Sequence, residues 1–308
     1  MKQPNYQILL YYKYIAIDDP EAVRDEQKAL CQSLNLKGRI IIAHEGINGT
    51  VEGTVEDREK YIQAMEKSRY FKGIYYKKSE GTGNAFPKLS VKVRPEVVTA
   101  GLPDLNPTQL TGKYLSSEEL HTWYEEAREF YLVDMRNDYE YASGYFKGFI
   151  PSGLQNFYDL KSVLPKLEHL KNKTVVTVCT GGIRCEKASG FLVQNGFSDV
   201  YQLKDGIQTY MEKYPNEHFK GKLYVFDNRI TLGFNTTDPK HEIVGRCDLC
   251  QKACDSYVNC AYNECHRHYI CCDNCLDRQT GLAFCNKDCK KNYFKITFHH
   301  RPQSSVLR

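Results

Sequence analysis

The sequence predicts a multidomain protein that combines α+β and α/β architecture: an N-terminal α+β sandwich, a central α/β domain with a parallel sheet, and a cysteine-rich C-terminal segment. The chain has 308 residues, 41% of them hydrophobic, which is too long for one comfortable core. The order of strand and helix patterns changes after about residue 100. Of the 13 cysteines, all but Cys31, Cys179 and Cys185 lie between Cys247 and Cys289. This uneven distribution marks the last segment as a separate unit.

The first domain is expected over residues 1–100. A strand rich in Tyr and Ile is predicted over 6–17, and a helix follows over 19–36 with a proline in its first turn. The stretch "GRIIIAHEGINGTVEGT" predicts a hairpin. A helix over 55–68 and a last strand in "LSVKVRPEVV" complete the order βαββαβ. That order is typical of a ferredoxin-like sandwich.

The second domain is expected over residues 116–219, after a linker at 101–115 that contains prolines and turn-forming residues. Ser116 and Glu119 form a capping box that opens a helix. Short apolar runs such as "YLVDM" and "TVVTV" then alternate with helical patterns, which predicts an α/β domain with a parallel sheet. The remaining segments are a cysteine-rich region at 220–300 and a polar tail at 301–308.

Cys179 is predicted to lie on a short turn between the buried strand "TVVTV" and a helix that ends at Gly196. The first N–H groups of that helix and its dipole would stabilise an anion at the turn. A thiolate is such an anion, so we expect a lowered pKa and a nucleophilic sulfur at Cys179. Alternatively, Cys179 is a small buried hydrophobic residue, which would not need the flanking Gly181, Gly182 and Arg184.

The length of this loop separates two reactive interpretations. Four residues lie between Cys179 and Arg184, one fewer than in the loop that wraps phosphate in a phosphatase. The tighter ring suits a single extra sulfur, or a small oxidised group on Cys179, better than a tetrahedral phosphate. The sequence therefore favours sulfur or oxygen chemistry at this cysteine.

At this loop the sequence resembles the rhodanese (sulfurtransferase) domain. In "YLVDMRNDYEYASGYFKGFIPSG" the positions that match the family signature are Asp134, Arg136, Glu140, Gly144 and Ile150. The resemblance implies that Cys179 carries a persulfide or an equivalent intermediate and that Arg184 closes the loop. Tyr145 stands where a His is usual, and Asp205 replaces the first glycine of the closing Gly-Gly motif. These departures concern the substrate more than the fold.

Cys185 follows Arg184 directly and is expected on the first turn of the helix. Two hypotheses remain open for it. It is a packing residue behind the loop, or it is a resolving thiol that traps an oxidised or persulfidated Cys179 as a disulfide.

Four cysteine pairs predict metal binding in the C-terminal segment. Two pairs have the C-x2-C spacing whose thiolates face one tetrahedral ion, and eight thiolates suffice for two structural zinc ions. The predicted ligands are Cys247, Cys250, Cys260, Cys265, Cys272, Cys275, Cys285 and Cys289. Cys254, Cys271, His266 and His268 are alternative ligands. Free thiols or an iron–sulfur cluster are the other interpretations, but cysteine pairs with polar residues between them favour zinc. The zinc would supply the folding energy, because the segment is poor in large aliphatic residues.

A second resemblance covers nearly the full chain, from about Tyr6 to about Cys289. A rhodanese-like domain between a ferredoxin-like domain bearing "EGINGT" and a tail that begins "VGRCDLC" resembles the bacterial tRNA uridine hydroxylase family. The resemblance implies hydroxylation of the wobble uridine to 5-hydroxyuridine, with molecular oxygen as co-substrate and the anticodon loop of tRNA as partner. The sequence carries no dinucleotide-binding fingerprint and no clear iron-ligand triad, so it does not indicate a redox cofactor.

Two features of the first domain allow a simpler interpretation. The stretch "HEGINGT" predicts a hairpin turn with Gly46 and Gly49 at positive φ. Lys88, Lys92 and Arg94 alternate with apolar residues and are expected on one face of a strand. A solvated sheet face explains them, and phosphate contacts are compatible with a tRNA partner.

The remaining sequence features limit the function classes. A formal charge of +4 permits a polyanionic partner. No secretory signal and no membrane span are predicted, so we expect a cytoplasmic protein without membrane partners. The leading hypothesis is a tRNA-modifying oxidoreductase. The alternatives are a persulfide-carrying sulfurtransferase and a non-catalytic zinc-bearing RNA-binding protein, and the tight loop from Cys179 to Arg184 counts against the latter.

Overall fold

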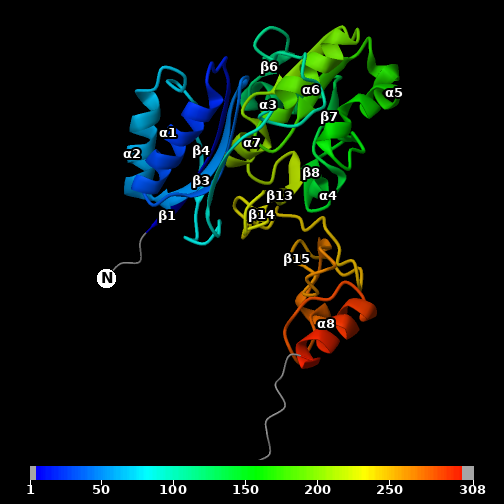
Figure 1. Ribbon diagram of the computed structural model, residues 1–308. Coiled ribbons are helices and arrows are strands. Elements are labelled where there is room, and N and C mark those ends of the chain that lie inside the picture. Colours follow the sequence, from blue (N-terminus) through cyan, green and yellow to red (C-terminus); the bar gives the residue numbers. More distant parts are fainter. Residues whose placement is uncertain (1–4, 300–308) are drawn as a thin grey trace, which may run out of the picture.

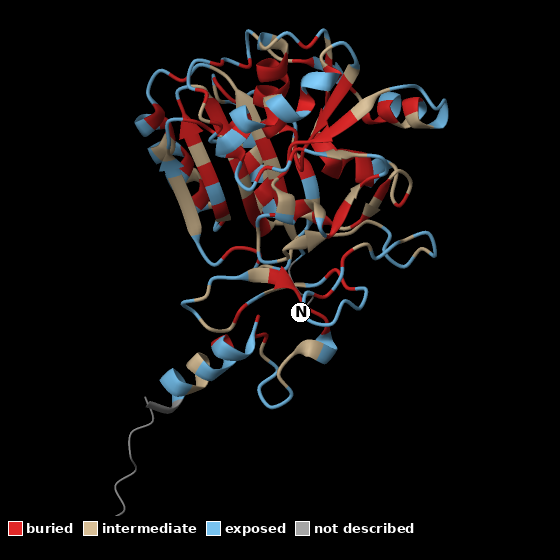
Figure 2. Cartoon of the chain, turned by 90° about the vertical axis from the view of Figure 1, so that its right-hand side faces the viewer, coloured by how far each residue is buried: buried red, intermediate tan, exposed pale blue. Residues whose placement is uncertain are grey.

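The computed structural model describes residues 5–299, so the tail predicted over 301–308 lies outside the described residues. Figure 1 shows an N-terminal sheet with two helices on its outer face. A second sheet, with its own helices, lies on the opposite side of the N-terminal sheet, and a C-terminal region lies below both. Buried residues gather in the two sheets and in the helices packed on them, as Figure 2 shows.

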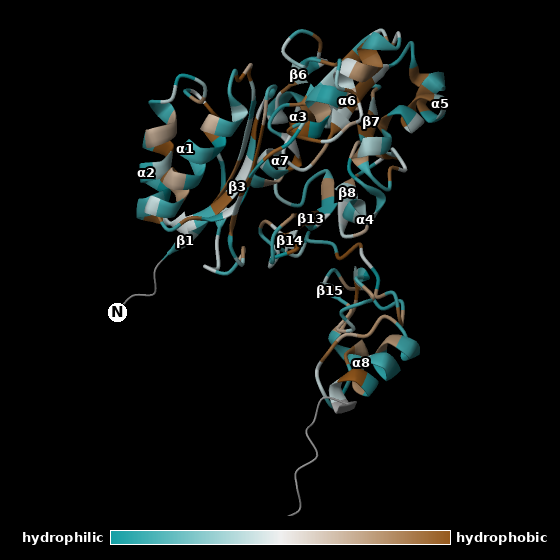
Figure 3. Ribbon diagram, in the orientation of Figure 1, coloured by the Kyte–Doolittle hydropathy of each residue, from teal (hydrophilic) through white to brown (hydrophobic). Residues whose placement is uncertain are grey.

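The N-terminal domain is a five-stranded sheet in the order β4-β1-β3-β2-β5. Its elements are β1 (Tyr6–Tyr14), α1 (Pro20–Ser33), β2 (Lys37–Ala43), β3 (Gly46–Thr54), α2 (Val55–Glu66), β4 (Lys77–Glu80) and β5 (Leu89–Val93). The side chains of Asp19 and Thr54 accept N–H groups at the starts of α1 and α2, which fixes where both helices begin. Both helices mix hydrophobic and hydrophilic residues (Figure 3), as expected for helices with one face on a sheet.

The predicted sandwich is present, with one strand more than predicted. The strand predicted in "LSVKVRPEVV" as the last of the sandwich is β5, which pairs in parallel with β2 at one edge of the sheet. The place beside β1 belongs instead to β4, which pairs with it antiparallel. The sequence of β4, KKSE, is short and has no apolar alternation. Its backbone pairing, and not a hydrophobic pattern, makes it a strand.

The hairpin turn between β2 and β3 lies earlier than predicted. Gly46 has φ +146°, and a Cβ there would lie 2.1 Å from the carbonyl oxygen of Lys13. The expectation of positive φ at Gly49 is wrong, because Gly49 lies inside β3, paired with Tyr11 and Ile40. A Cβ at Gly49 would lie 2.3 Å from the Tyr11 ring. This glycine makes room for a side chain and not for a turn.

The second domain has a five-stranded parallel sheet in the order β6-β11-β10-β7-β9, as predicted for an α/β domain. Its strands are β6 (Lys113–Leu115), β7 (Tyr131–Asp134), β9 (Ile150–Pro151), β10 (Thr174–Val178) and β11 (Asp199–Leu203). Its helices are α3 (Ser117–Glu125), α4 (Asp138–Tyr141), η1 (Phe157–Val163), α5 (Leu164–Leu167), η2 (Glu168–Leu170), α6 (Ile183–Gln194) and α7 (Gly206–Lys213). The capping box of Ser116 and Glu119 is confirmed at the start of α3.

Two hydrophobic clusters cover the two faces of this sheet. One contains Ala188 and Leu192 of α6, and the other contains Leu120 of α3 and Ile207 of α7. Buried valines of β10 belong to both clusters. The central strand is therefore buried on both faces, which is the usual state of a parallel sheet. Cys179 follows β10 directly, so it lies inside the protein.

Short strands lead from the second domain into the C-terminal region. They are β8 (Gly144–Phe146) paired with β12 (Phe219–Gly221), β13 (Leu223–Tyr224) with β14 (Thr231–Leu232), and β15 (Tyr257–Asn259) with β16 (His268–Ile270), followed by η3 (Asp273–Cys275) and α8 (Lys287–His299). The buried cluster of this region consists mostly of cysteines, with Tyr269, Ile270 and Ala283 as its other buried members. Such a core buries too little apolar surface to hold the region together by itself.

Candidate active site

Cys179 lies at the end of β10, on the loop that enters α6. Gly182, at φ +97°, turns the chain, and its N–H lies 3.2 Å from the Cys179 sulfur as a donor. The side chain of Cys179 is completely shielded from solvent. The sulfur is therefore held at the N-terminus of α6, shielded from bulk solvent.

The pKa of Cys179 is lowered from its ordinary value of 9.0 to about 6. Burial acts in the opposite direction and raises it. The Cys185 thiol, the charge of Arg184 and the N–H groups of Cys185 and Gly182 together outweigh burial. The lowered pKa favours the thiolate at neutral pH.

Arg184 is held in place by Glu140. The guanidinium donates two hydrogen bonds to the carboxylate, with N–O distances of 2.5 and 2.8 Å. Both side chains are buried, and the charge of Glu140 raises the pKa of Arg184 against the effect of burial. A bidentate pair of this kind fixes the plane of the guanidinium as well as its position.

The other signature residues form a rigid support below this pair. Asp134 and Arg136 are both fully buried, and the Arg136 Nη2 lies 2.6 Å from the Asp134 carboxylate. Arg136 also donates to the carbonyl oxygens of Glu140 and Gly144. Every member of this network has a partner, so the buried charges cost less than they would alone. The signature thus positions Glu140, which in turn positions Arg184.

Helix α7 closes the loop from the other side. The N–H groups of Ile207 and Gln208 donate to the carbonyl oxygens of Cys179 and Thr180. A Cβ at Gly206 would lie 2.5 Å from the nitrogen of Gly182, so only glycine fits at this position. The preceding Asp205 has φ +63°, which explains why a glycine is usual there and why Asp is tolerated.

The N-terminal domain packs directly on the loop. Side chains of β1 lie so close to Gly181 and Gly182 that a Cβ at either glycine would lie 2.9 Å from Leu10 or from the Tyr12 hydroxyl. Tyr12 also donates to Glu186 on the first turn of α6, at 3.0 Å. The two glycines therefore permit both the turn and the domain contact.

A buried ion cluster holds the same two domains together. Lys187 of α6 is fully buried, and its amine lies 2.9 Å from Glu45 and 2.7 Å from Glu96. Glu45 is the acidic residue of "HEGINGT" and also accepts the N–H of Val97. No local pattern indicates this role, because the lysine partner of Glu45 lies in the other domain.

A cavity of about 400 Å³ lies over the Cys179 loop. It is lined by Leu10 and Asn48 of the N-terminal sheet, by Cys179 and Arg184 of the second domain, and by Phe226 from the segment that follows. Its volume is in the range usual for small-molecule sites. All three parts of the chain contribute to the wall, so the substrate would be enclosed by all three.

Cys185 lies on the first turn of α6, buried behind the loop. Burial and the nearby Cys179 sulfur raise the pKa of Cys185 well above its ordinary value. The raised pKa favours the protonated thiol, which could donate a hydrogen bond to the Cys179 thiolate. This geometry adds a third hypothesis, that of a hydrogen-bond donor, to the packing residue and the resolving thiol.

The predicted ligand cysteines converge in two quartets. Within each quartet the sulfur atoms lie within 4.8 Å of one another; the first is Cys247, Cys250, Cys272 and Cys275, and the second is Cys260, Cys265, Cys285 and Cys289. Individual sulfur–sulfur distances of 3.4 to 3.6 Å are close to the spacing of about 3.8 Å that follows from a tetrahedron with Zn–S bonds of about 2.3 Å. The chemistry and spacing of both quartets fit a metal ion. The pairs interleave along the chain, since the first joins the third and the second joins the fourth.

The predicted RNA-contacting residues lie apart from Cys179. All three are exposed, Lys92 on the edge strand β5 and Lys88 and Arg94 directly before and after it, and none of them lines the cavity. Leu89 and Val91 of the same strand pack against the helix-covered core. Lys92 alternates with them and pairs with Ile41, which lines the cavity, so it faces the side of the sheet that carries the cavity.

Sequence reasoning missed Arg39 and Phe226. Arg39 projects from β2 into the cavity wall, and Phe226 follows β13. Neither belongs to a spacing motif, so no local signal marks them. One further structural finding concerns membranes: within residues 5–299, no helix has the length and apolar character needed to cross one.

Taken together, the parallel sheet, the Cys179 loop at its central strand and the closure by Arg184 define a rhodanese-type domain. Family models agree: a rhodanese-like domain matches residues 116–213, a UPF0176 acylphosphatase-like domain matches 6–97, and a rhodanese C-terminal domain matches 220–290. A rhodanese-like domain protein from Staphylococcus aureus is 26% identical in a match that covers 32% of this chain and 90% of that chain, with a TM-score of 0.28.

Two curated relatives match nearly the whole chain. The tRNA uridine(34) hydroxylase of Bacillus cytotoxicus is 43% identical over 94% of this chain and 89% of its own length. The protein of the same name from Cytophaga hutchinsonii is 42% identical over 93% of this chain and 90% of its own. The chain belongs to the tRNA uridine(34) hydroxylase family.

Proposed function

We propose that this protein is a tRNA-modifying oxidoreductase that uses molecular oxygen to convert the wobble uridine of the anticodon loop to 5-hydroxyuridine. The observation that carries the proposal is the Cys179 thiolate at a cavity of about 400 Å³, which can enclose one base taken out of a loop. The names of relatives that match at 42% and 43% identity support it. Because tRNA is the substrate, the proposed location is the cytoplasm.

In the proposed reaction a Cys179-derived nucleophile adds to C6 of the uracil ring, which makes C5 electron-rich. Molecular oxygen supplies the C5 hydroxyl oxygen. The second oxygen atom leaves as water, with two electrons and two protons from an external reductant. Loss of the C5 proton and departure of Cys179 then restore the aromatic ring.

The residues around Cys179 prepare the nucleophile. Gly182 donates a hydrogen bond to the sulfur, and Arg184 and Cys185 favour its anionic form. The N-terminal domain packs on the loop and shields the sulfur from bulk solvent. These contacts exist before substrate binds, so little reorganisation is needed for the attack.

Two structural zinc ions, one in each cysteine quartet, are part of the same proposal. A site with four thiolates has no open position for substrate, so the metal would stabilise the fold and take no part in the reaction. The exposed Lys88, Lys92 and Arg94 are proposed to contact tRNA phosphates outside the cavity. They would contribute affinity and not the choice of base.

Nucleoside mass spectrometry of tRNA from a deletion strain tests the proposal. The wild-type gene and Cys31→Ala should restore 5-hydroxyuridine, whereas Cys179→Ser should not. Cys31 is a matched control because it is buried in the N-terminal core, far along the chain from the loop. With purified protein and oxygen-18 gas, the new hydroxyl should carry the label. Thiocyanate release from thiosulfate and cyanide, with tRNA unchanged, would instead establish a sulfurtransferase and overturn the proposal.

A further inference from the structure

A second cavity adjoins the one over Cys179. It has a volume of about 510 Å³ and reaches Asn259 and His268 of the cysteine-rich region. The two cavities share four lining residues, namely Arg39, Val225, Phe226 and Asp227. They are therefore neighbouring compartments divided by one short segment and one arginine.

The dividing segment presents an exposed aromatic ring. Phe226 is 48% exposed although it is large and apolar. Its position is fixed by Tyr224, whose ring meets it edge-on at 5.3 Å, and Tyr224 in turn meets His268 edge-on at 5.7 Å. The Tyr257 and His268 rings stack at 4.8 Å. Phe226 is thus an exposed ring on a rigid aromatic support, as in proteins that stack unpaired bases.

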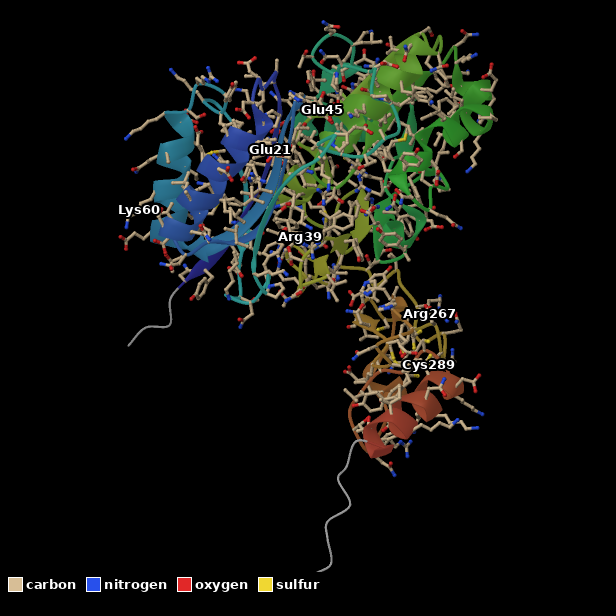
Figure 4. The ribbon with its side chains drawn as sticks, in the orientation of Figure 1. Glu21, Arg39, Glu45, Lys60, Arg267 and Cys289 are labelled. Atoms are coloured by element: carbon tan, nitrogen blue, oxygen red, sulfur yellow. The ribbon has the colours of Figure 1, made fainter. Side chains whose placement is uncertain are left out.

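Arg39 supplies an unused positive charge at the same place. It is exposed on β2, and its guanidinium makes no hydrogen bond or ion pair with any residue from 5 to 299. Arg229, which also lines the catalytic cavity, is by contrast occupied by Asp227 and Ser79. Figure 4 shows Arg39 on the side of the N-terminal sheet that faces the rest of the molecule, away from Lys60 on the outer helix.

His268 adds a polar group to the far wall. Its Nδ1 lies 2.9 Å from the Asn259 side-chain oxygen, which can only accept, so Nδ1 carries the proton. Nε2 is then an acceptor in the neutral ring, and this buried atom has no partner. Burial lowers the pKa of His268, which favours the neutral ring. An N–H or a ribose hydroxyl placed in the cavity could donate to it.

From these four observations we propose that the second cavity binds a nucleotide next to the target uridine. Its base stacks on Phe226, the phosphate between the two nucleotides pairs with Arg39, and an N–H or 2′-hydroxyl donates to Nε2 of His268. The inference rests on the proposed function, because it places the target base over Cys179. It assigns to the cysteine-rich region a direct part in reading the anticodon loop.

Binding of an anticodon stem-loop RNA tests the proposal in the full-length Cys179→Ser protein, so that catalysis does not interfere. Phe226→Leu keeps an apolar side chain but removes the ring, and should weaken binding by about tenfold or more. Arg39→Gln should lower the slope of log affinity against log salt by about 0.7. Lys60→Gln, an exposed cation on α2, is the matched control and should leave affinity and slope nearly unchanged.

RNAs with one abasic nucleotide identify the stacked base. If Phe226 stacks on a neighbour of the target, removing that neighbour's base should weaken wild-type binding and should weaken Phe226→Leu no further. Coupling to the target uridine itself, or to no position, would overturn the inference. If the RNA binds with this coupling but is not hydroxylated by the wild-type protein, the proposed reaction fails while the second site stands. If the wild-type protein does not bind the RNA, both fail.

Discussion

Arg184 and Glu140 lie 44 positions apart in the sequence and form a bidentate ion pair beneath the loop that carries Cys179. The pair has two consequences. It holds a positive charge near the sulfur, and it partly cancels that charge with a carboxylate. The pKa of Cys179 therefore depends on both residues, in opposite directions.

Glu140→Gln and Arg184→Met should move the pKa of Cys179 in opposite directions from about 6. The first removes a negative charge and leaves Arg184 free to stabilise the thiolate, so the pKa falls. The second removes the cation and leaves a buried carboxylate, so the pKa rises. The rate of iodoacetamide alkylation at Cys179, followed by peptide mass spectrometry across pH, gives the midpoint. Shifts of the same sign in both variants would contradict this electrostatic account.

Both substitutions should also lower the free energy of unfolding by about 3–5 kcal/mol, because each breaks a buried ion pair. Glu118→Gln provides a matched control. Glu118 and Lys213 form a partly exposed pair, whose loss should cost about 0–1 kcal/mol. Denaturant unfolding measures all three.

Substitutions at Cys185 separate the hypotheses for that residue. If the Cys185 thiol donates to Cys179, Cys185→Ala should raise the pKa of Cys179, and Cys185→Ser should keep it near 6 because a hydroxyl also donates. If Cys185 resolves an oxidised intermediate, serine should fail like alanine in repeated turnover, whatever the pKa. If it only packs, neither variant should move the pKa. The alkylation profile and the number of turnovers distinguish these results.

Features encoded by nearby residues could be predicted from the sequence. The strand, turn and helix around Cys179, the capping box at Ser116 and the parallel sheet each depend on a local pattern that the structure retains. The cysteine pairs were recognisable for the same reason. Which two pairs share a metal site was not recognisable, because nothing in the spacing specifies which pair meets which.

Features that depend on tertiary assembly could not be predicted. Strand β4 is defined by pairing with β1 and has no apolar alternation of its own. Gly49 has its role through the Tyr11 ring, and Glu45 through a lysine of another domain. Arg39 and Phe226 become neighbours only when the N-terminal sheet docks against the segment after β13. In each case the partner lies far along the chain.

Gly206→Ala and Gly196→Ala should differ although both glycines have positive φ. At Gly196, with φ +84°, a Cβ would meet nothing within 4 Å, so alanine there should cost only the backbone strain of about 1–2 kcal/mol. At Gly206 a Cβ would also meet the Gly182 nitrogen at 2.5 Å. Gly206→Ala should therefore cost more, and it should raise the pKa of Cys179 by displacing the Gly182 N–H. An unchanged alkylation profile in Gly206→Ala would argue against this contact.

Loss of one quartet cysteine should release metal from the C-terminal region while the parallel sheet survives. We expect two zinc ions per chain in the wild-type protein and at most one in Cys250→Ser, as measured by elemental analysis of purified protein. Cys254→Ser is the matched control, because Cys254 is a buried cysteine of the same region outside both quartets. Since that region has few apolar residues to bury, its amides should exchange faster in Cys250→Ser. Amides of β10 should stay protected, because that strand is buried between two hydrophobic clusters of the second domain. Equal metal loss in Cys250→Ser and Cys254→Ser would mean that the quartets are not the ligand sets.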